Sequence, residues 1–207
     1  MKKILIFDLD GVLIDSEKSM LFSWNAVRAE FNLKQSFSLY KKYIGLEFQE
    51  LIKNLKIYEN QKKIEFSYRK NALLNQNKIK LYPSVIKTLK SLSKKYDLAI
   101  YTSKEKLRVG KIVKKYFNNI KFVFVQSPQK NFKSKPDPGL LLNVIKKKKI
   151  NLKNCIYIGD TLIDKKLARS SKINFIYASY GQYYKHMKHK YKIASFSELP
   201  NILKKIK

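Results

Sequence analysis

The sequence predicts an α/β fold, a doubly wound parallel sheet with an inserted helical segment. Three observations lead to this prediction. Short apolar runs, which are typical of buried strands, alternate with amphipathic helical segments along most of the chain. Polar or acidic residues follow several of these runs, whereas residues 16–82 contain no such run. Because strand–helix–strand connections are almost always right-handed crossovers, the strands are expected to be parallel.

The first strand is predicted in the apolar run that begins at Ile4 and meets the sequence Asp8-Leu9-Asp10. Periodicity alone does not separate such a short run from a buried helix segment. On a strand, Asp8 and Asp10 are two residues apart and would point to the same side. The other four strands are predicted at residues 97–102, 122–125, 155–160 and 173–178.

Helices are predicted between these strands from apolar residues spaced three and four apart. Pro83 occupies the favoured first-turn position of one helix, which would turn Val85 and Leu89 inward. The remaining core helices are predicted at residues 107–117, 140–150 and 163–171.

Residues 16–82 are predicted to form a small bundle of helices. Ser16 is a candidate N-cap for a first helix with an apolar face. Residues 47–55 and 61–77 also show a helical pattern, and Gly45 interrupts the pattern ahead of them.

This change of pattern indicates two units within the chain. We assign residues 1–15 and 83–207 to the core and residues 16–82 to a small inserted helical domain. The alternative is that these helices only cover the sheet.

Length and composition limit the class of protein. The 207 residues fit one domain that carries a smaller insert, and a hydrophobic content of 44% supports a real core. No apolar run approaches the roughly 18 residues of a membrane span. The single Cys155 cannot form an internal disulfide and is predicted to be a small buried residue. These features favour the cytoplasm, without a membrane partner, and a monomer is compatible with them.

The net charge of +30 suggests nucleic-acid binding at first sight. However, the chain has only four Arg beside 41 Lys, and the lysines are scattered over almost every segment. Surfaces that read bases or clamp phosphates favour the guanidinium fork of Arg. We therefore expect no nucleic-acid partner, although a positive field would attract an anionic substrate.

Acidic residues, unlike the lysines, are clustered. Four of the seven Asp lie in two short windows, Asp8 with Asp10 and Asp160 with Asp164. Each window follows a predicted strand, and the carboxyl ends of parallel strands share one edge of a sheet. Carboxylates brought together there repel one another unless a cation compensates them. Mg2+ prefers oxygen ligands and often accompanies phosphate, so we predict a Mg2+ site.

Two further polar positions are expected at this edge. Thr102 and Ser103 end the second strand. Lys135 lies in a loop, residues 127–138, where two prolines beside it would stiffen the backbone and help to aim its side chain. Lys133 lies in the same loop and is the alternative candidate for this role.

These residue types together suffice for phosphoryl transfer through an aspartyl phosphate. Asp8 would attack phosphorus, and Asp10 would protonate the leaving oxygen and later activate water. Mg2+ held by Asp8 and Asp160 would shield the nucleophile from the phosphate charge. Thr102 and a neighbouring backbone N–H would bind phosphate oxygens, and Lys135 would neutralise the transferring group.

Four segments follow one another along the chain: residues 7–13 (FDLDGVL), 101–103 (YTS), 135–138 (KPDP) and 159–164 (GDTLID). In this order, they resemble the motifs of the haloacid dehalogenase-like phosphohydrolases, in the branch of phosphoglycolate phosphatase and β-phosphoglucomutase. The resemblance spans nearly the whole chain, and the helical insert is similar to the cap of that branch, with Gly45 at a substrate-facing cap loop.

The resemblance implies a role for each motif residue. Asp8 would be the nucleophile, and Asp10 the acid/base, which would also lend its backbone carbonyl to Mg2+. Asp160 would be a metal ligand, and Asp164 would support the metal directly or through water. The residues implied to bind the substrate phosphate are Gly11, Thr102, Ser103 and Lys135.

By resemblance, the chain is a Mg2+-dependent phosphatase of a small phosphorylated metabolite, similar to phosphoglycolate or a sugar phosphate. A carboxyl at Asp10 is typical of the phosphatases and phosphomutases and is lacking in the dehalogenases. Ser103 and Thr161 depart from the usual Asn and Ser of the phosphoglycolate-like members. A sugar phosphomutase is the first alternative, although no His lies near residues 18–20, where the β-phosphoglucomutases have one. A basic nucleic-acid-binding protein on an inactive scaffold is the second.

Two other patterns have an ordinary interpretation. His186 and His189 have a spacing that can bind metal, but no third ligand is near, so a solvated helix or loop is expected. Tyr and Lys alternate there and at residues 40–43, which would suit stacking on single-stranded nucleic acid. Partly buried Tyr beside solvated Lys is the preferred interpretation.

Overall fold

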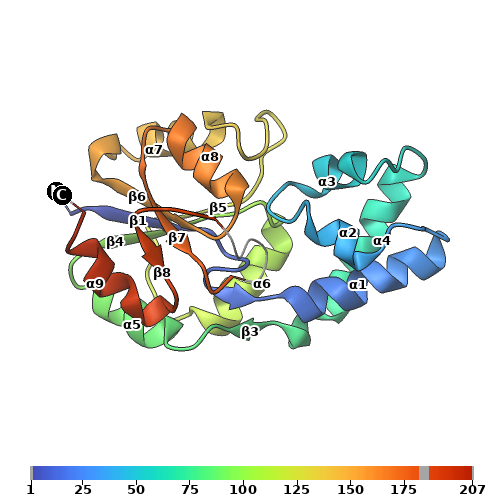
Figure 1. Ribbon diagram of the computed structural model, residues 1–207, viewed down its shortest axis with the longest axis horizontal. Coiled ribbons are helices and arrows are strands. Elements are labelled where there is room, and N and C mark those ends of the chain that lie inside the picture. Colours follow the sequence, from blue (N-terminus) through green and yellow to red (C-terminus); the bar gives the residue numbers. More distant parts are fainter. Residues whose placement is uncertain (1, 182–186, 207) are drawn as a thin grey trace.

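The computed structural model describes residues 2–181 and 187–206 and contains a six-stranded sheet with helices on both faces (Figure 1). Every pairing in this sheet is parallel, which confirms the predicted fold class. The strands lie in the order β5 (Phe124–Gln126), β4 (Asp97–Tyr101), β1 (Ile4–Phe7), β6 (Cys155–Gly159), β7 (Asn174–Ala178) and β8 (Lys192–Ile193).

Five helices pack on the two faces of this sheet. On one face, residues of α5, α6 and α9 share a hydrophobic cluster with Leu5 and Phe7 of β1. On the other face, residues of α7 and α8 cluster with Ile4 and Ile6. The bounds of these helices are α5 (Val85–Leu92), α6 (Lys106–Tyr116), α7 (Gly139–Lys147), α8 (Leu162–Ser170) and α9 (Leu199–Leu203).

Burial on both faces explains why β1 is apolar at every position instead of alternating. The chain turns to opposite sides of β1, since β4 pairs with one edge of it and β6 with the other. Ligands of such sheets bind at the carboxyl ends of the strands, where the strand order reverses. The fold therefore directs attention to the residues after β1 and β6. Cys155, the first residue of β6, is buried as predicted.

Four helices between the first strand and the rest of the core pack mainly on one another. Their hydrophobic cluster includes Trp24, Ile52 and Tyr68, and among the described residues it contains none from the six-stranded sheet. Figure 1 shows them beside the sheet and not over either face. The helices are α1 (Glu17–Glu30), α2 (Phe37–Lys41), α3 (Phe48–Asn54) and α4 (Gln61–Leu74).

Both connections between these helices and the core pass through a short antiparallel pair, β2 (Ile14–Asp15) and β3 (Lys80–Leu81). The expected domain boundaries, after residues 15 and 82, adjoin this pair. Because these helices have a hydrophobic cluster of their own, they do not form a layer on the sheet. That they act as a separate domain stays a prediction.

Several boundaries differ from the sequence-based prediction. The helix expected to begin at Pro83 begins at Val85, because Ser84 has a left-handed φ of 64° that cannot belong to a helix. The strand expected at residues 122–125 lies at Phe124–Gln126, where Phe124 pairs with Ala99. Three short 3-10 helices were also not predicted: Gln76–Lys78, Leu152–Asn154 and Phe196–Glu198.

Within the described part of the chain, no helix has both the length and the apolar character that crossing a bilayer requires.

Candidate active site

Two acidic residues directly follow the central pair of strands. Asp8 comes after β1 and Asp160 after β6, and the backbone N–H of Asp8 donates to the carbonyl of Ile158 at 2.9 Å. Asp164 lies in the first turn of α8, which begins directly behind Asp160. The parallel pairing of β1 with β6 therefore brings the two acidic motifs together.

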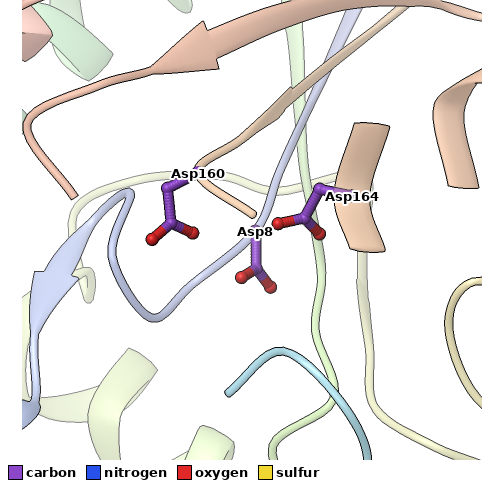
Figure 2. Close-up of side chains that lie close together, drawn as sticks. All are labelled: Asp8, Asp160 and Asp164. Atoms are coloured by element: carbon purple, nitrogen blue, oxygen red, sulfur yellow. The ribbon is translucent and has the colours of Figure 1, made fainter. Parts of the chain in front are cut away.

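The carboxylates of Asp8, Asp160 and Asp164 form a buried group. One oxygen of each lies within 4.8 Å of those of the other two, and the three residues are 5%, 1% and 0% exposed. Figure 2 shows the three carboxylates gathered around a common space, approached from a strand end, a loop and a helix. Like charges held this close in a low dielectric disfavour one another strongly.

Asp164 is held by the protein through both of its oxygens. Its Oδ2 accepts from the Thr161 hydroxyl at 2.6 Å and from the Thr161 backbone N–H at 3.2 Å. The Thr161 side chain in turn accepts from the Asp164 backbone N–H, and the two side chain–backbone hydrogen bonds make a capping box for α8. Its Oδ1 accepts from Lys135 Nζ at 3.1 Å and from the Tyr157 hydroxyl at 3.2 Å. With its lone pairs shared in this way, Asp164 suits a supporting position better than direct ligation.

Asp160 has the opposite environment. Neither of its carboxylate oxygens has a hydrogen-bond partner among the described residues, although both are buried. Desolvation raises the pKa of Asp160 well above its usual value, and the charges of Asp164 and Asp8 raise it further. A buried carboxylate without partners is costly unless a cation compensates it. A hard divalent cation with oxygen ligands fits this donor set.

Glycines make room for the Asp160 carboxylate. A Cβ on Gly11 would lie 2.1 Å from Asp160 Oδ2, and one on Gly181 would lie 2.5 Å from the same atom. Gly11 also has a φ of +80°, which side chains other than glycine rarely adopt. Gly11 therefore acts at this site through its backbone, as the turn that passes beneath Asp160.

Lys135 reaches the site from the loop before α7. Its Nζ lies 2.9 Å from Asp8 Oδ1 and donates to the Tyr157 hydroxyl at 2.6 Å. Burial disfavours the ammonium form, but the charges of Asp164 and Asp8 outweigh it and raise the pKa of Lys135. Lys135 is 3% exposed, so of the two candidate lysines in this loop it is the one at the acids.

Even with this partner, Asp8 is not fully compensated. Desolvation, together with the charges of Asp164 and Asp10, raises its pKa to about 7 in spite of the lowering effect of Lys135. A second cation at this place would favour the ionised carboxylate, which is the nucleophilic form.

Asp10 lies apart from the other three acids. The strand ends at Phe7, so Asp8 and Asp10 do not follow the alternation that the sequence suggested. The Asp10 Oδ1 atom accepts a short hydrogen bond from the Ser16 hydroxyl and forms an ion pair with Lys104 Nζ at 3.0 Å. Ser16 thus precedes α1 as expected, but its side chain does not cap the helix. Metal binding by the Asp10 backbone carbonyl stays a prediction.

A cavity of about 420 Å3 lies between the helical insert and the carboxyl ends of the strands. Asp8, Asp10 and Thr102 line it from the core, and Tyr40 and Phe48 line it from the insert. The site is therefore adjacent to a space large enough for a small metabolite.

The predicted residues at the end of β4 are also in the cavity wall. The Thr102 side chain accepts from the Lys104 backbone N–H at 3.2 Å, and Thr102 is 4% exposed. The Ser103 hydroxyl donates to the Gly45 carbonyl at 2.7 Å, which links the core to the helical insert. Ser103 thus donates its hydroxyl proton to the insert, so its contribution to binding a phosphate would come from its backbone N–H.

Sequence reasoning missed Lys104 and Arg108. Both line the cavity and are less than 10% exposed. Burial lowers the pKa of Lys104 to about 8, helped by the positive charge of Arg108, although Asp10 acts in the opposite direction. Their only signal in the sequence is proximity to Thr102, because one Lys among 41 attracts no notice.

The structure tests only in part the interpretations given to the histidine pair and to the alternating Tyr and Lys residues. Tyr40 is buried against Trp24 and donates a hydrogen bond to the Tyr68 hydroxyl at 2.7 Å, which makes it a core residue. His189 is half-buried, with Nε2 2.8 Å from the Phe175 carbonyl. His186 lies outside the described residues.

Comparison with known proteins places these features among a large group of enzymes. A family model described as haloacid dehalogenase-like hydrolase matches residues 5–178. A phosphoglycolate phosphatase of Haemophilus influenzae is 26% identical over 199 residues, 88% of each chain. A beta-phosphoglucomutase of Bacillus subtilis is 24% identical and covers 76% of this chain and 75% of its own.

The same group appears among solved structures. A haloacid dehalogenase-like family hydrolase of Streptococcus pneumoniae superimposes with a TM-score of 0.86 at 18% identity, over 98% of each chain. At this level of identity, the similarity establishes the fold.

Proposed function

Because this chain belongs to the haloacid dehalogenase-like hydrolases, we propose that it is a Mg2+-dependent phosphatase that transfers the phosphoryl group of a small metabolite to Asp8. One observation carries the proposal. Asp160 presents two buried oxygens without partners beside Asp8, which is itself paired with Lys135. A divalent cation would supply the positive charge that Asp160 and Asp8 lack, and it would also offset the negative charge of a bound phosphate.

Asp8 and Asp160 are the residues that would hold Mg2+, with Asp164 supporting it and the Asp10 carbonyl as a further ligand. When bound, Mg2+ would screen the phosphate from the Asp8 carboxylate. Lys135 would keep the Asp8 carboxylate oriented and would neutralise part of the charge on the transferring group. The Thr102 hydroxyl and backbone N–H groups near Gly11 and Ser103 would donate hydrogen bonds to the phosphate oxygens.

The reaction would then proceed in two displacements. An oxygen of Asp8 attacks phosphorus, the bond to the leaving oxygen breaks, and that oxygen takes a proton from Asp10. Water next attacks the phosphorus of the aspartyl phosphate and gives its proton to Asp10, which restores Asp8 and releases phosphate. For its first role, Asp10 must exchange its contact with Lys104 for one with the leaving oxygen.

The helical insert would act as a cap over the substrate. Its residues form one wall of the cavity, and Arg69 of α4 reaches Glu105 in the core at 2.9 Å. A cap in this position excludes water from the transferring group and sets selectivity by the shape of its wall. The leaving group is proposed to be a small acid or sugar, and the place of action the cytoplasm, where a chain with one cysteine needs no disulfide.

The proposed metal gives the first testable prediction. We expect purified protein to hydrolyse p-nitrophenyl phosphate with Mg2+, to lose this activity in EDTA and to regain it when Mg2+ is restored. Asp160→Asn should raise the half-saturating Mg2+ concentration by about tenfold or more, because it removes a charged ligand. Without Mg2+, the same variant should melt no lower than wild type, since one of three repelling carboxylates is gone.

Asp97→Asn is the matched control. Asp97 begins β4 at the opposite edge of the sheet, so the same chemical change there should leave the Mg2+ requirement within about twofold. Undiminished hydrolysis in EDTA would contradict the proposal.

A phosphomutase acting on a sugar phosphate is the second candidate, because one of the relatives is a beta-phosphoglucomutase. It differs from the phosphatase in the fate of the phosphoryl group. Incubation with β-glucose 1-phosphate and a catalytic amount of glucose 1,6-bisphosphate distinguishes them: a mutase produces glucose 6-phosphate, whereas a phosphatase produces inorganic phosphate.

A further inference from the structure

Arg108 lines the cavity and is buried there with part of its guanidinium group unpaired. It belongs to the first turn of α6, six residues after Thr102, and is 4% exposed. Among the described residues, its Nε and Nη2 atoms have no hydrogen-bond partner, and it takes part in no salt bridge. A guanidinium stays charged at every pH that a protein tolerates, so this is a buried, uncompensated cation.

The other arginine of the cavity shows the contrast. Arg69 pairs with Glu65 on its own helix and with Glu105 across the cavity, and 43% of its side chain is exposed. Two carboxylates thus satisfy Arg69, whereas none lies within ion-pair distance of Arg108 among the described residues.

Neighbouring groups do not compensate Arg108 either. Lys104 is close enough for Arg108 to help lower its pKa, so this neighbouring charge has the same sign. The Asp10 carboxylate is already shared between Lys104 and Ser16, and Glu105 is paired with Arg69. The Tyr68 hydroxyl lies within hydrogen-bonding reach of Arg108, but burial raises the pKa of Tyr68 above its usual value and keeps the hydroxyl neutral, so it brings no negative charge. This corner of the cavity therefore has an excess of buried positive charge.

We propose that Arg108, assisted by Lys104, binds a second anionic group of the substrate, a carboxylate or a phosphate distinct from the one transferred to Asp8. The proposal rests on the proposed phosphatase function and adds the class of substrate. Planar guanidinium groups bind carboxylate and phosphate oxygens through two parallel hydrogen bonds, which is the valence that Nε and Nη2 leave open. A phosphate ester with a neutral alcohol would leave this corner without a counter-charge.

Three probes with the same two-carbon chain test this selectivity. 2-Phosphoglycolate has a carboxylate at the second position, ethane-1,2-diyl bisphosphate has a phosphate, and 2-hydroxyethyl phosphate has a neutral hydroxyl. In wild type with Mg2+, we expect kcat/KM for at least one anionic probe to exceed that for the neutral probe by about tenfold or more. Which anionic probe is preferred identifies the second group.

Variants of Arg108 locate the source of the preference. Arg108→Gln should lower kcat/KM for the preferred anionic probe by about tenfold or more, mainly through KM, and that for 2-hydroxyethyl phosphate by less than about twofold. Arg108→Lys, which keeps the charge but not the fork, should fall between. Arg169→Gln removes an equal charge from the exposed end of α8 and should change none of the ratios.

Binding to the Asp8→Asn variant gives a readout that does not require turnover. Calorimetry with Mg2+ should show that adding Arg108→Gln weakens the preferred anionic probe by about tenfold and leaves the neutral probe within about twofold. Absence of hydrolysis in wild type would remove the proposed function, and this measurement would still decide on Arg108. Equal binding of all three probes, or an equal loss on all three in Arg108→Gln, overturns the inference.

Discussion

Asp8→Asn is expected to reduce the hydrolysis of p-nitrophenyl phosphate by about 10,000-fold or more, the largest effect of any single substitution in this chain. An amide cannot attack phosphorus as a carboxylate does, so the covalent step is lost and not merely slowed. The change conserves volume, and the Asn Oδ1 atom still accepts from Lys135, which now contacts Asp8 Oδ1 at 2.9 Å. The measurement is kcat in excess Mg2+, with residual activity compared with buffer alone.

The loss of activity in Asp8→Asn must be shown to come from the missing nucleophile and not from a damaged structure. If Asp8 is the nucleophile, the variant should bind inorganic phosphate in saturating Mg2+ about as tightly as wild type, although the half-saturating Mg2+ concentration should rise because a charged ligand is removed. The variant should melt no lower than wild type, because a member of a repelling group becomes neutral. Asp97→Asn should retain full activity. A variant that keeps more than about one hundredth of wild-type kcat would refute nucleophilic attack by Asp8.

Much of the sheet was predictable because β1, β4, β6 and β7 are buried on both faces. Such strands are continuous apolar runs, and the sequence shows them at 4–7, 98–101, 155–158 and 175–178. The predicted meeting of the acidic windows followed from parallel pairing alone, since the ends of neighbouring parallel strands share an edge.

The short elements were not predictable, because pairing with a neighbour defines them. β8 is only Lys192–Ile193, and its strand character comes from lying beside Tyr177 and Ala178. Likewise, β2 and β3 have two residues each, and only their pairing with each other makes them strands. Sequence periodicity needs at least four residues to show an alternation, so it cannot detect such elements.

Side-chain partners at the site were the least predictable. The sequence indicated that Asp8 and Asp10 would act from one strand face, but the turn at Gly11 sends Asp10 to Ser16 and Lys104. Lys104 and Arg108 become significant only through burial, which is a tertiary property. In a chain with 41 lysines, charge and spacing do not distinguish a buried lysine from a solvated one.

Asp10→Asn is expected to separate two classes of substrate. If Asp10 protonates the leaving oxygen, the variant should lower kcat/KM for an alkyl phosphate, such as 2-phosphoglycolate, by about 100- to 10,000-fold. For p-nitrophenyl phosphate, whose leaving group is stable as an anion, kcat/KM should fall less than about tenfold. This ratio reports the steps up to the first bond cleavage, so the later role of Asp10 does not affect it.

The second role of Asp10 predicts a different signature in kcat. Water attack on the aspartyl phosphate needs a base whatever the first leaving group was, so kcat should fall for p-nitrophenyl phosphate as well. The phosphorylated Asp8 should then accumulate, and rapid mixing should show a burst of about one p-nitrophenolate per protein chain, followed by slow turnover. Wild type, with Asp10 available, should show a smaller burst or none. Equal losses of kcat/KM on both substrates without a burst would instead indicate that Asp10 only holds Lys104 and Ser16 in place, as its contacts in the structure also allow.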